Sequence, residues 1–154
     1  MIPGLKMYLD SAIITKLLVR EPDSAWFNEN VAEHELWSSE LSLAEVRSAL
    51  LIKERTKQIS ANQRKSAFAC FESMIEEKFF RLHPLNLHVV ERASSLLVGC
   101  HPEVSLRSLD ALHVATAWMH PHGALCATDE RMRTAARRVG LSCFPETISE
   151  IVNQ

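Results

Sequence analysis

Short apolar runs alternate along the chain with longer amphipathic stretches. Runs such as residues 5–9 and 124–128 have the length and character of buried strands. In the longer stretches apolar residues recur every three or four positions, as Phe68, Phe71 and Met74 do, which is the spacing of one helix face. The pattern predicts strands at residues 5–9, 35–38, 79–82, 124–128 and 141–144. It predicts helices between Ser11 and Pro22, after Asp23, from Ser42 to a polar turn near Lys57, around residues 68–75, and at residues 86–97, 106–119 and 130–139.

Helices separate the predicted strands, which is the order of elements in proteins with a parallel sheet. The strands are apolar along their length, so we expect helices to cover both faces of the sheet. The chain therefore predicts an α/β fold, a three-layer sandwich with a short, mostly parallel sheet flanked by helices. Because no repeat or linker divides the sequence, we expect a single domain over residues 1–154 with its core at about residues 7–144.

The composition limits the class of protein without indicating a function. The chain has 154 residues, of which 47% are hydrophobic and 23% charged, as is typical of a globular domain. Its formal net charge is −2, so contact with a polyanion would need a local basic patch. The four glycines do not have the spacing of a glycine-rich phosphate loop, which argues against a nucleotide site of that kind.

The cysteines and the hydropathy of the chain indicate the cellular compartment in which we expect the protein. The four cysteines form no Cys-x-x-Cys pair, and we see no secretory signal before them. We therefore expect free thiols in a reducing cytoplasm. No apolar run approaches the roughly 18 residues that a membrane helix needs, so we expect no membrane partner.

Acidic residues stand where ligands bind in parallel α/β proteins, beyond the carboxyl ends of the strands. Asp10 follows the first predicted strand, and Asp129 follows a later buried strand. Glu45 lies in the first turn of its helix, and Asp110 lies near the start of another helix. We expect these four side chains to converge on one edge of the sheet.

Each acid also has a purely structural interpretation. Ser42 and Glu45 have the spacing of a capping box. Asp129 could cap the helix that follows it, and Asp10 could lie in a turn. Asp110 could interact favourably with the helix dipole at the start of its helix.

The structural interpretation is weakest for Asp110. Its surroundings are apolar, and the residues three and four positions further on, His113 and Val114, provide no cation. A carboxylate in such a segment needs a metal ion or a firm hydrogen-bond partner. Four carboxylates at one edge would raise one another's pKa values, and a divalent cation would relieve the repulsion. Carboxylate oxygens with few imidazoles favour Mg²⁺ or Mn²⁺.

Four blocks of sequence carry these acids. They are Y-L-D-S-A at residues 8–12 with K-L-L at 16–18, S-L-A-E-V-R-S-A-L at 42–50, L-D-A-L-H-V-A-T-A at 109–117, and A-T-D at 127–129 followed by A-A at 135–136 and G-L at 140–141. In their order and spacing the blocks resemble the PIN-domain ribonucleases, and most closely the VapC-type toxins of type II toxin–antitoxin systems. The resemblance runs from about Met7 to Phe144, nearly the whole chain.

The resemblance implies a PIN fold and a metal-dependent endoribonuclease, the toxin of a toxin–antitoxin pair. It implies that the family's four acids are Asp10, Glu45, Asp110 and Asp129, which would hold one or two Mg²⁺ (or Mn²⁺) ions. Thr128 matches the small hydroxyl residue before the family's last acid and is expected to orient the site. The family also suggests products with 5′-phosphate and 3′-hydroxyl ends.

The chemistry of such a set is in-line attack on a scissile phosphate by a water whose pKa a metal lowers. Asp10 and Asp110 are expected as the main ligands, and Asp129 as a direct or water-mediated ligand. Glu45 is expected to orient the attacking water or to act as its base. Glu40 competes with Glu45 for this role, but it precedes the helix and lacks the E-V-R-S-A-L context.

The resemblance also implies partners: an RNA substrate (tRNA, rRNA or mRNA), a cognate antitoxin protein and a second copy of the chain in a homodimer. Basic residues must hold the RNA phosphates. The group closest to the predicted site is Arg131, Arg133, Arg137 and Arg138.

Two aromatic pairs could belong either to the core or to an interface. Trp26 and Phe27 are expected in the core or in a groove that takes an antitoxin helix. Phe68 and Phe71 are expected in the core or at a homodimer face.

Two other classes of function stay open. A catalytically silent PIN-like module that binds RNA or protein would use the acids only as caps and would bind no metal. A phosphatase of the aspartyl-phosphate type is less favoured, because it needs a second aspartate two residues after the first, where this chain has Ala12.

Overall fold

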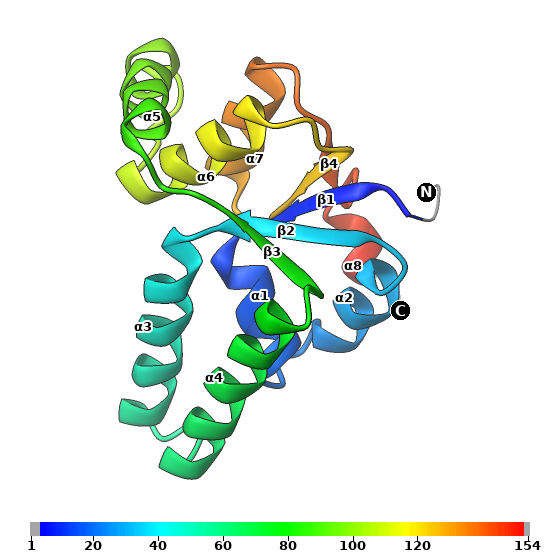
Figure 1. The fold of residues 1–154 in the computed structure, drawn as a ribbon. Coiled ribbons are helices and arrows are strands. Elements are labelled where there is room, and N and C mark those ends of the chain that lie inside the picture. The colour runs from blue at the N-terminus through cyan, green and yellow to red at the C-terminus, as the bar shows by residue number, and fades with distance from the viewer. Residues whose placement is uncertain (1–3, 153–154) are drawn as a thin grey trace.

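A computed structural model describes residues 4–152 and contains a five-stranded sheet between two layers of helices (Figure 1). The strands are β1 (Lys6–Leu9), β2 (Glu35–Ser39), β3 (Phe80–His83), β4 (Ala124–Cys126) and β5 (Cys143–Phe144). The helices are α1 (Ser11–Leu18), α2 (Ser24–Val31), α3 (Leu41–Arg55), α4 (Ala61–Glu76), α5 (Leu87–Cys100), α6 (Ser108–Met119), α7 (Glu130–Arg138) and α8 (Ser149–Val152). All of the strand pairs are parallel, in the order β3-β2-β1-β4-β5, which confirms the predicted α/β sandwich.

The two faces of the sheet bury separate halves of the core. Met7 and Leu9 on β1 contribute to one half and Tyr8 to the other, because successive side chains of a strand point to opposite faces. Helices α1 to α4 and α8 cover the first face, and α5, α6 and α7 cover the second (Figure 1). Both faces are therefore shielded, which explains why the strands are apolar throughout.

The predicted elements agree with the structure except near their ends. Helix α6 begins at Ser108, two residues later than predicted, and α5 continues to Cys100. Asp10 caps α1, with its Oδ1 accepting the Ile13 N–H at 2.9 Å. The short helix α8 was not predicted.

Both aromatic pairs lie in the core. Trp26 stacks on Phe144 with ring centroids 5.5 Å apart, and Phe27 is fully buried beside it. Phe68 and Phe71 pack edge to face at 6.0 Å and are also buried. The core interpretation is therefore confirmed for both pairs, and neither presents an open face to a partner.

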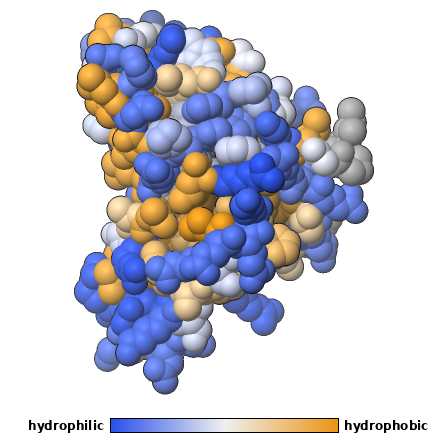
Figure 2. Space-filling view, in the orientation of Figure 1, coloured by the Kyte–Doolittle hydropathy of each residue, from blue (hydrophilic) through white to orange (hydrophobic). Residues whose placement is uncertain are grey.

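The surface is mixed in character. Hydrophilic residues dominate the view in Figure 2, and hydrophobic residues gather at α5, where Leu87, Val90 and Val98 are exposed. Within residues 4–152, every helix is too short or too polar to cross a bilayer.

Candidate active site

The four acids lie on elements that meet at the carboxyl edge of the sheet. Asp10 directly follows β1, and Asp129 follows the neighbouring strand β4 and caps α7. Asp110 lies in the first turn of α6. Glu45 projects from α3, near enough for its charge to act on Asp10. Asp10, Asp110 and Asp129 thus lie at helix starts. The prediction of Glu45 in the first turn of its helix is wrong, because α3 begins at Leu41 and Glu45 lies just beyond that turn.

Asp10 is the most deeply placed of the acids. It is buried, and its Oδ1 is held by the Ile13 N–H at the start of α1. The pKa of this carboxyl is raised to about 6, chiefly by burial and to a smaller extent by the negative charges of Glu45 and Asp110. His113 and the Ile13 hydrogen bond act in the opposite direction. The raised pKa thus reflects the burial of Asp10 first and the neighbouring carboxylates second.

Asp110 has a cation that the sequence analysis missed. The prediction considered only the residues after Asp110, but the cation stands three positions before it. Arg107 Nε donates to Asp110 Oδ2 at 2.8 Å, and its Nη2 lies 3.7 Å from Asp129 Oδ2. The spacing of three residues at a helix start was the available signal. One guanidinium therefore links two of the four acids.

Glu45 does not take part in a capping box. Helix α3 begins at Leu41, and the hydroxyl of Ser42 is hydrogen-bonded to the hydroxyl of Ser38 at 2.7 Å. The structural interpretation of Glu45 is therefore wrong. Its Oε1 instead lies 2.5 Å from Nε2 of His113 on α6, across the junction of two helices.

Asp129 does cap its helix, but it has a second contact. Its Oδ1 accepts the Met132 N–H at 3.0 Å, and its Oδ2 faces the guanidinium groups of Arg107 and Arg131 at 3.7 and 3.9 Å. Thr128, half-buried, directly precedes it in the loop after β4. The cap fixes one oxygen and directs the other toward the remaining acids.

Glu40 has a different environment from Glu45. Its Oε2 accepts the backbone N–H of Leu85 at 3.0 Å and so ties the start of α3 to the loop after β3. The structure thus gives Glu40 a structural partner and brings Glu45, not Glu40, to the other acids.

The predicted basic patch needs a correction at Arg133, which is completely buried. Its guanidinium donates to the backbone oxygens of Ala127, Pro145 and Glu146 at 2.7 to 2.9 Å. The prediction treated it as one of a row of surface arginines, but it lies on the inner face of α7. The other members, Arg131, Arg137 and Arg138, are exposed.

The donor atoms of the site suit a hard divalent cation, because all four acids offer carboxylate oxygens. Within residues 4–152, no three acidic, histidine or cysteine side chains are already arranged around an ion position. Arg107 supplies positive charge between Asp110 and Asp129 instead. Its side chain is 62% exposed and can turn to solvent, so the residues present fit such an ion after a local rearrangement.

The fold and the acidic edge define a nuclease-like α/β domain, and a comparison of sequences gives its family. Residues 7–138 match the model of the PIN domain, so the chain belongs to the PIN-domain family. Within it, the chain is similar to Ribonuclease VapC46 of Mycobacterium tuberculosis (strain ATCC 25618 / H37Rv). The two are 37% identical over 139 residues, which cover 88% of this chain and 94% of that protein.

Solved structures agree on the fold. The chain is similar to VapC20 of Mycobacterium tuberculosis, a sarcin–ricin loop cleaving toxin, with a TM-score of 0.67 and 16% identity over 92% of this chain and 98% of that one. It is similar to VapBC2 from Rickettsia felis bound to a promoter DNA fragment (TM-score 0.62, 15% identity) and to FitAcB from Neisseria gonorrhoeae (TM-score 0.61, 18% identity). Each of these last two matches covers 85% of this chain and 93% of the other.

Proposed function

We propose that this protein is a metal-dependent endoribonuclease, the toxin of a toxin–antitoxin pair, which hydrolyses RNA phosphodiester bonds. The observation that carries the proposal is the meeting of Asp10, Glu45, Asp110 and Asp129 at one edge of the sheet in a PIN-family chain. Its similarity to a ribonuclease over most of its length supports the same activity.

The acids have distinct roles in this proposal. Asp10, Asp110 and Asp129 would hold Mg²⁺ or Mn²⁺, with Glu45 as a further ligand or as the base. When bound, the ion supplies Lewis-acid charge and an acidified water. The caps at Asp10 and Asp129 keep these two carboxylates in place before RNA binds.

Glu45 and Arg107 complete the site. Glu45 orients the attacking water and accepts its proton on the carboxylate oxygen that His113 does not contact. With an ion held by the acids, Arg107 would be free to turn toward the RNA backbone, where a guanidinium suits a phosphate. Thr128 shapes the loop that carries Asp129.

The partners follow from the same comparison. VapBC2 and FitAcB, which share the fold, support an antitoxin partner, and we propose a homodimer as well. We propose a cytoplasmic location, in keeping with four free cysteine thiols. Among RNA classes, rRNA is the first substrate to test because VapC20 cleaves the sarcin–ricin loop. The other two substrates to test are tRNA and mRNA.

The test is cleavage of total bacterial RNA by purified protein, freed of any antitoxin, with Mn²⁺ or Mg²⁺. We compare wild type with Asp110→Asn, which keeps the shape of the side chain and removes its charge. Glu40→Gln is the matched control, because it makes the same change at an acid with a structural partner. We expect discrete fragments from wild type and Glu40→Gln, and a loss of at least about 100-fold in Asp110→Asn and in EDTA.

The other outcomes are informative. Equal cleavage by wild type and Asp110→Asn would indicate a contaminating nuclease. No cleavage by folded wild type on any of the three RNA classes would refute the proposal and favour a PIN-like binding module.

A further inference from the structure

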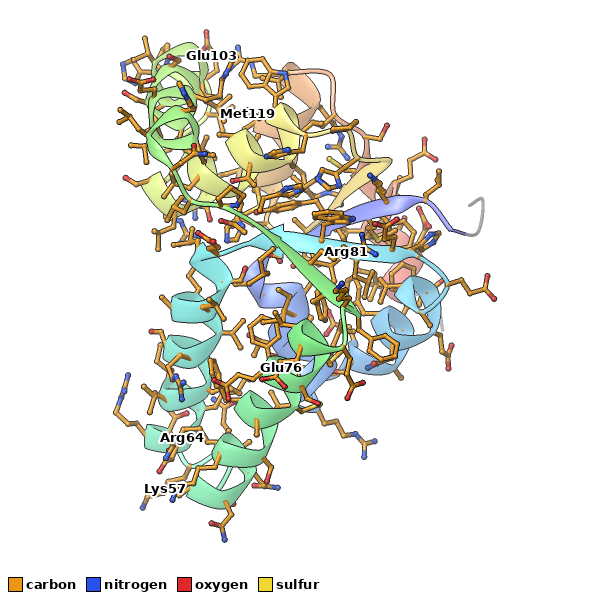
Figure 3. All side chains as sticks on the ribbon, in the orientation of Figure 1. Lys57, Arg64, Glu76, Arg81, Glu103 and Met119 are labelled. Atoms are coloured by element: carbon orange, nitrogen blue, oxygen red, sulfur yellow. The ribbon has the colours of Figure 1, made fainter. Side chains whose placement is uncertain are left out.

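A chain of hydrogen bonds runs from the centre of the sheet to the candidate site. The hydroxyl of Tyr8 lies 2.8 Å from Nδ1 of His113, and Nε2 of His113 lies 2.5 Å from Oε1 of Glu45. Tyr8 and His113 are 0% and 1% exposed, whereas the Glu45 side chain is 21% exposed. Side chains fill the space between α6, which carries Met119, and the part of the sheet that carries Arg81 (Figure 3). The chain thus connects the interior to one oxygen of a candidate catalytic acid.

The direction of these hydrogen bonds follows from the groups involved. An ionised carboxylate has no proton to donate, so the contact with Glu45 requires a proton on Nε2 of His113. Burial raises the pKa of Tyr8, so its hydroxyl keeps its proton and can donate a hydrogen bond to Nδ1. Both ring nitrogens of His113 then have a partner, with Nε2 as the donor to Glu45.

Helix α6 relates this histidine to the rest of the site. Asp110 and His113 are three residues apart and therefore lie on neighbouring positions of one helix face. Glu45 comes from a different helix, and a glutamate side chain without a partner samples several rotamers. A donor on α6 therefore holds Glu45 in a defined position relative to Asp110.

We propose that His113, supported by Tyr8, is a positioning residue that fixes the carboxylate of Glu45 for RNA cleavage. The Nε2–H of His113 holds Oε1, and Oε2 is left to face the attacking water. The inference rests on the function proposed above. It assigns His113 no contact with RNA and no proton transfer.

The first experiment measures kcat and KM for Mn²⁺-supported cleavage of one RNA fragment. The variants are His113→Leu, which removes the donor, and His113→Gln, whose amide can still donate to Glu45. We expect His113→Leu to lower kcat by about tenfold or more with little change in KM, because an oriented general base contributes at least that much. We expect His113→Gln to recover most of kcat. His88→Leu, at an exposed histidine on α5, is the matched control and should behave as wild type.

A double-mutant cycle separates positioning from a general effect on the fold. In a Glu45→Ala background, His113→Leu should lower kcat no further, because the residue it positions is absent. An equal loss in both backgrounds, or unchanged kcat in His113→Leu, would overturn the inference. Circular dichroism at the assay temperature checks that each variant is folded.

A second measurement does not depend on activity. Nitrogen-15 NMR of labelled histidine should show a proton on Nε2 of His113, with a resonance that moves in Tyr8→Phe and in Glu45→Ala. A His113 ring with no proton on Nε2 would overturn the inference even in an active enzyme. If wild type is inactive but His113 carries the expected proton on Nε2, the proposed function is wrong and the hydrogen-bond arrangement is right.

Discussion

Arg133 offers the sharpest test of how the site is held in place. Its buried guanidinium joins Ala127, directly after β4, to the backbone of Pro145 and Glu146 after β5. Asp129 lies two residues after Ala127 in the loop that follows β4. The substitution Arg133→Met keeps the length and the apolar stem of the side chain and removes all of its donors.

The cost can be worked from the contacts. The guanidinium serves the oxygens of Ala127 and Pro145, whereas the Glu146 oxygen also accepts from Arg137 at 3.3 Å. Two buried acceptors thus lose their donor, at about 1–3 kcal/mol each. Avoiding the burial of a charge offsets part of this. We expect a loss of about 3 kcal/mol in the free energy of unfolding, or roughly 6–12 °C in the melting temperature for a chain of this size.

The assay is urea unfolding followed by circular dichroism at pH 7.5. The midpoint should fall without a change in the slope of the transition. The matched control is Arg137→Met, a change at an exposed arginine on the same helix, which should stay within about 0.5 kcal/mol of wild type. An Arg133→Met protein as stable as this control would refute the reasoning, because the guanidinium would then contribute nothing that a methionine cannot replace.

Three further predictions concern the acids and their cation. The pKa of Asp10 is about 6 in the folded protein, against an ordinary 3.8, so the folded state favours the proton and loses stability as the pH rises from about 4 to above 6. Asp10→Asn, which still offers an oxygen to cap α1, should therefore raise the free energy of unfolding by about 2 kcal/mol at pH 7.5 and change it little at pH 4; equal effects at both pH values would contradict this. Mn²⁺ at about 100 times its dissociation constant should stabilise the wild-type protein by about 2.7 kcal/mol in a thermal melt. It should not stabilise Asp110→Asn. Equal stabilisation of both proteins would show that the ion binds elsewhere. Arg107→Ala should bind Mn²⁺ about three- to tenfold more tightly by calorimetry, because an exposed competing charge is removed, and weaker binding would show that Arg107 supports the ion.

Much of the fold could be predicted from the sequence, because its signals are local. Helical and strand periodicities depend on neighbouring residues, and they placed the strands of the sheet close to where the structure has them. When a helix closely follows a strand, the polar residue between them lies at the carboxyl edge of the sheet. The positions of Asp10 and Asp129 were therefore predictable once β1 and β4 were recognised.

The partners that are far apart in the sequence depended on tertiary structure. His113 and Glu45 are 68 positions apart, and only the packing of α3 near α6 brings them to 2.5 Å. Ser42 bonds to Ser38 instead of forming the capping box that its spacing favours. Arg133 has the sequence surroundings of a surface residue, yet the segment after β5 covers it. Local sequence thus determined which residues reach the edge of the sheet, whereas contacts between distant segments determined which charges are paired, buried or left available for chemistry.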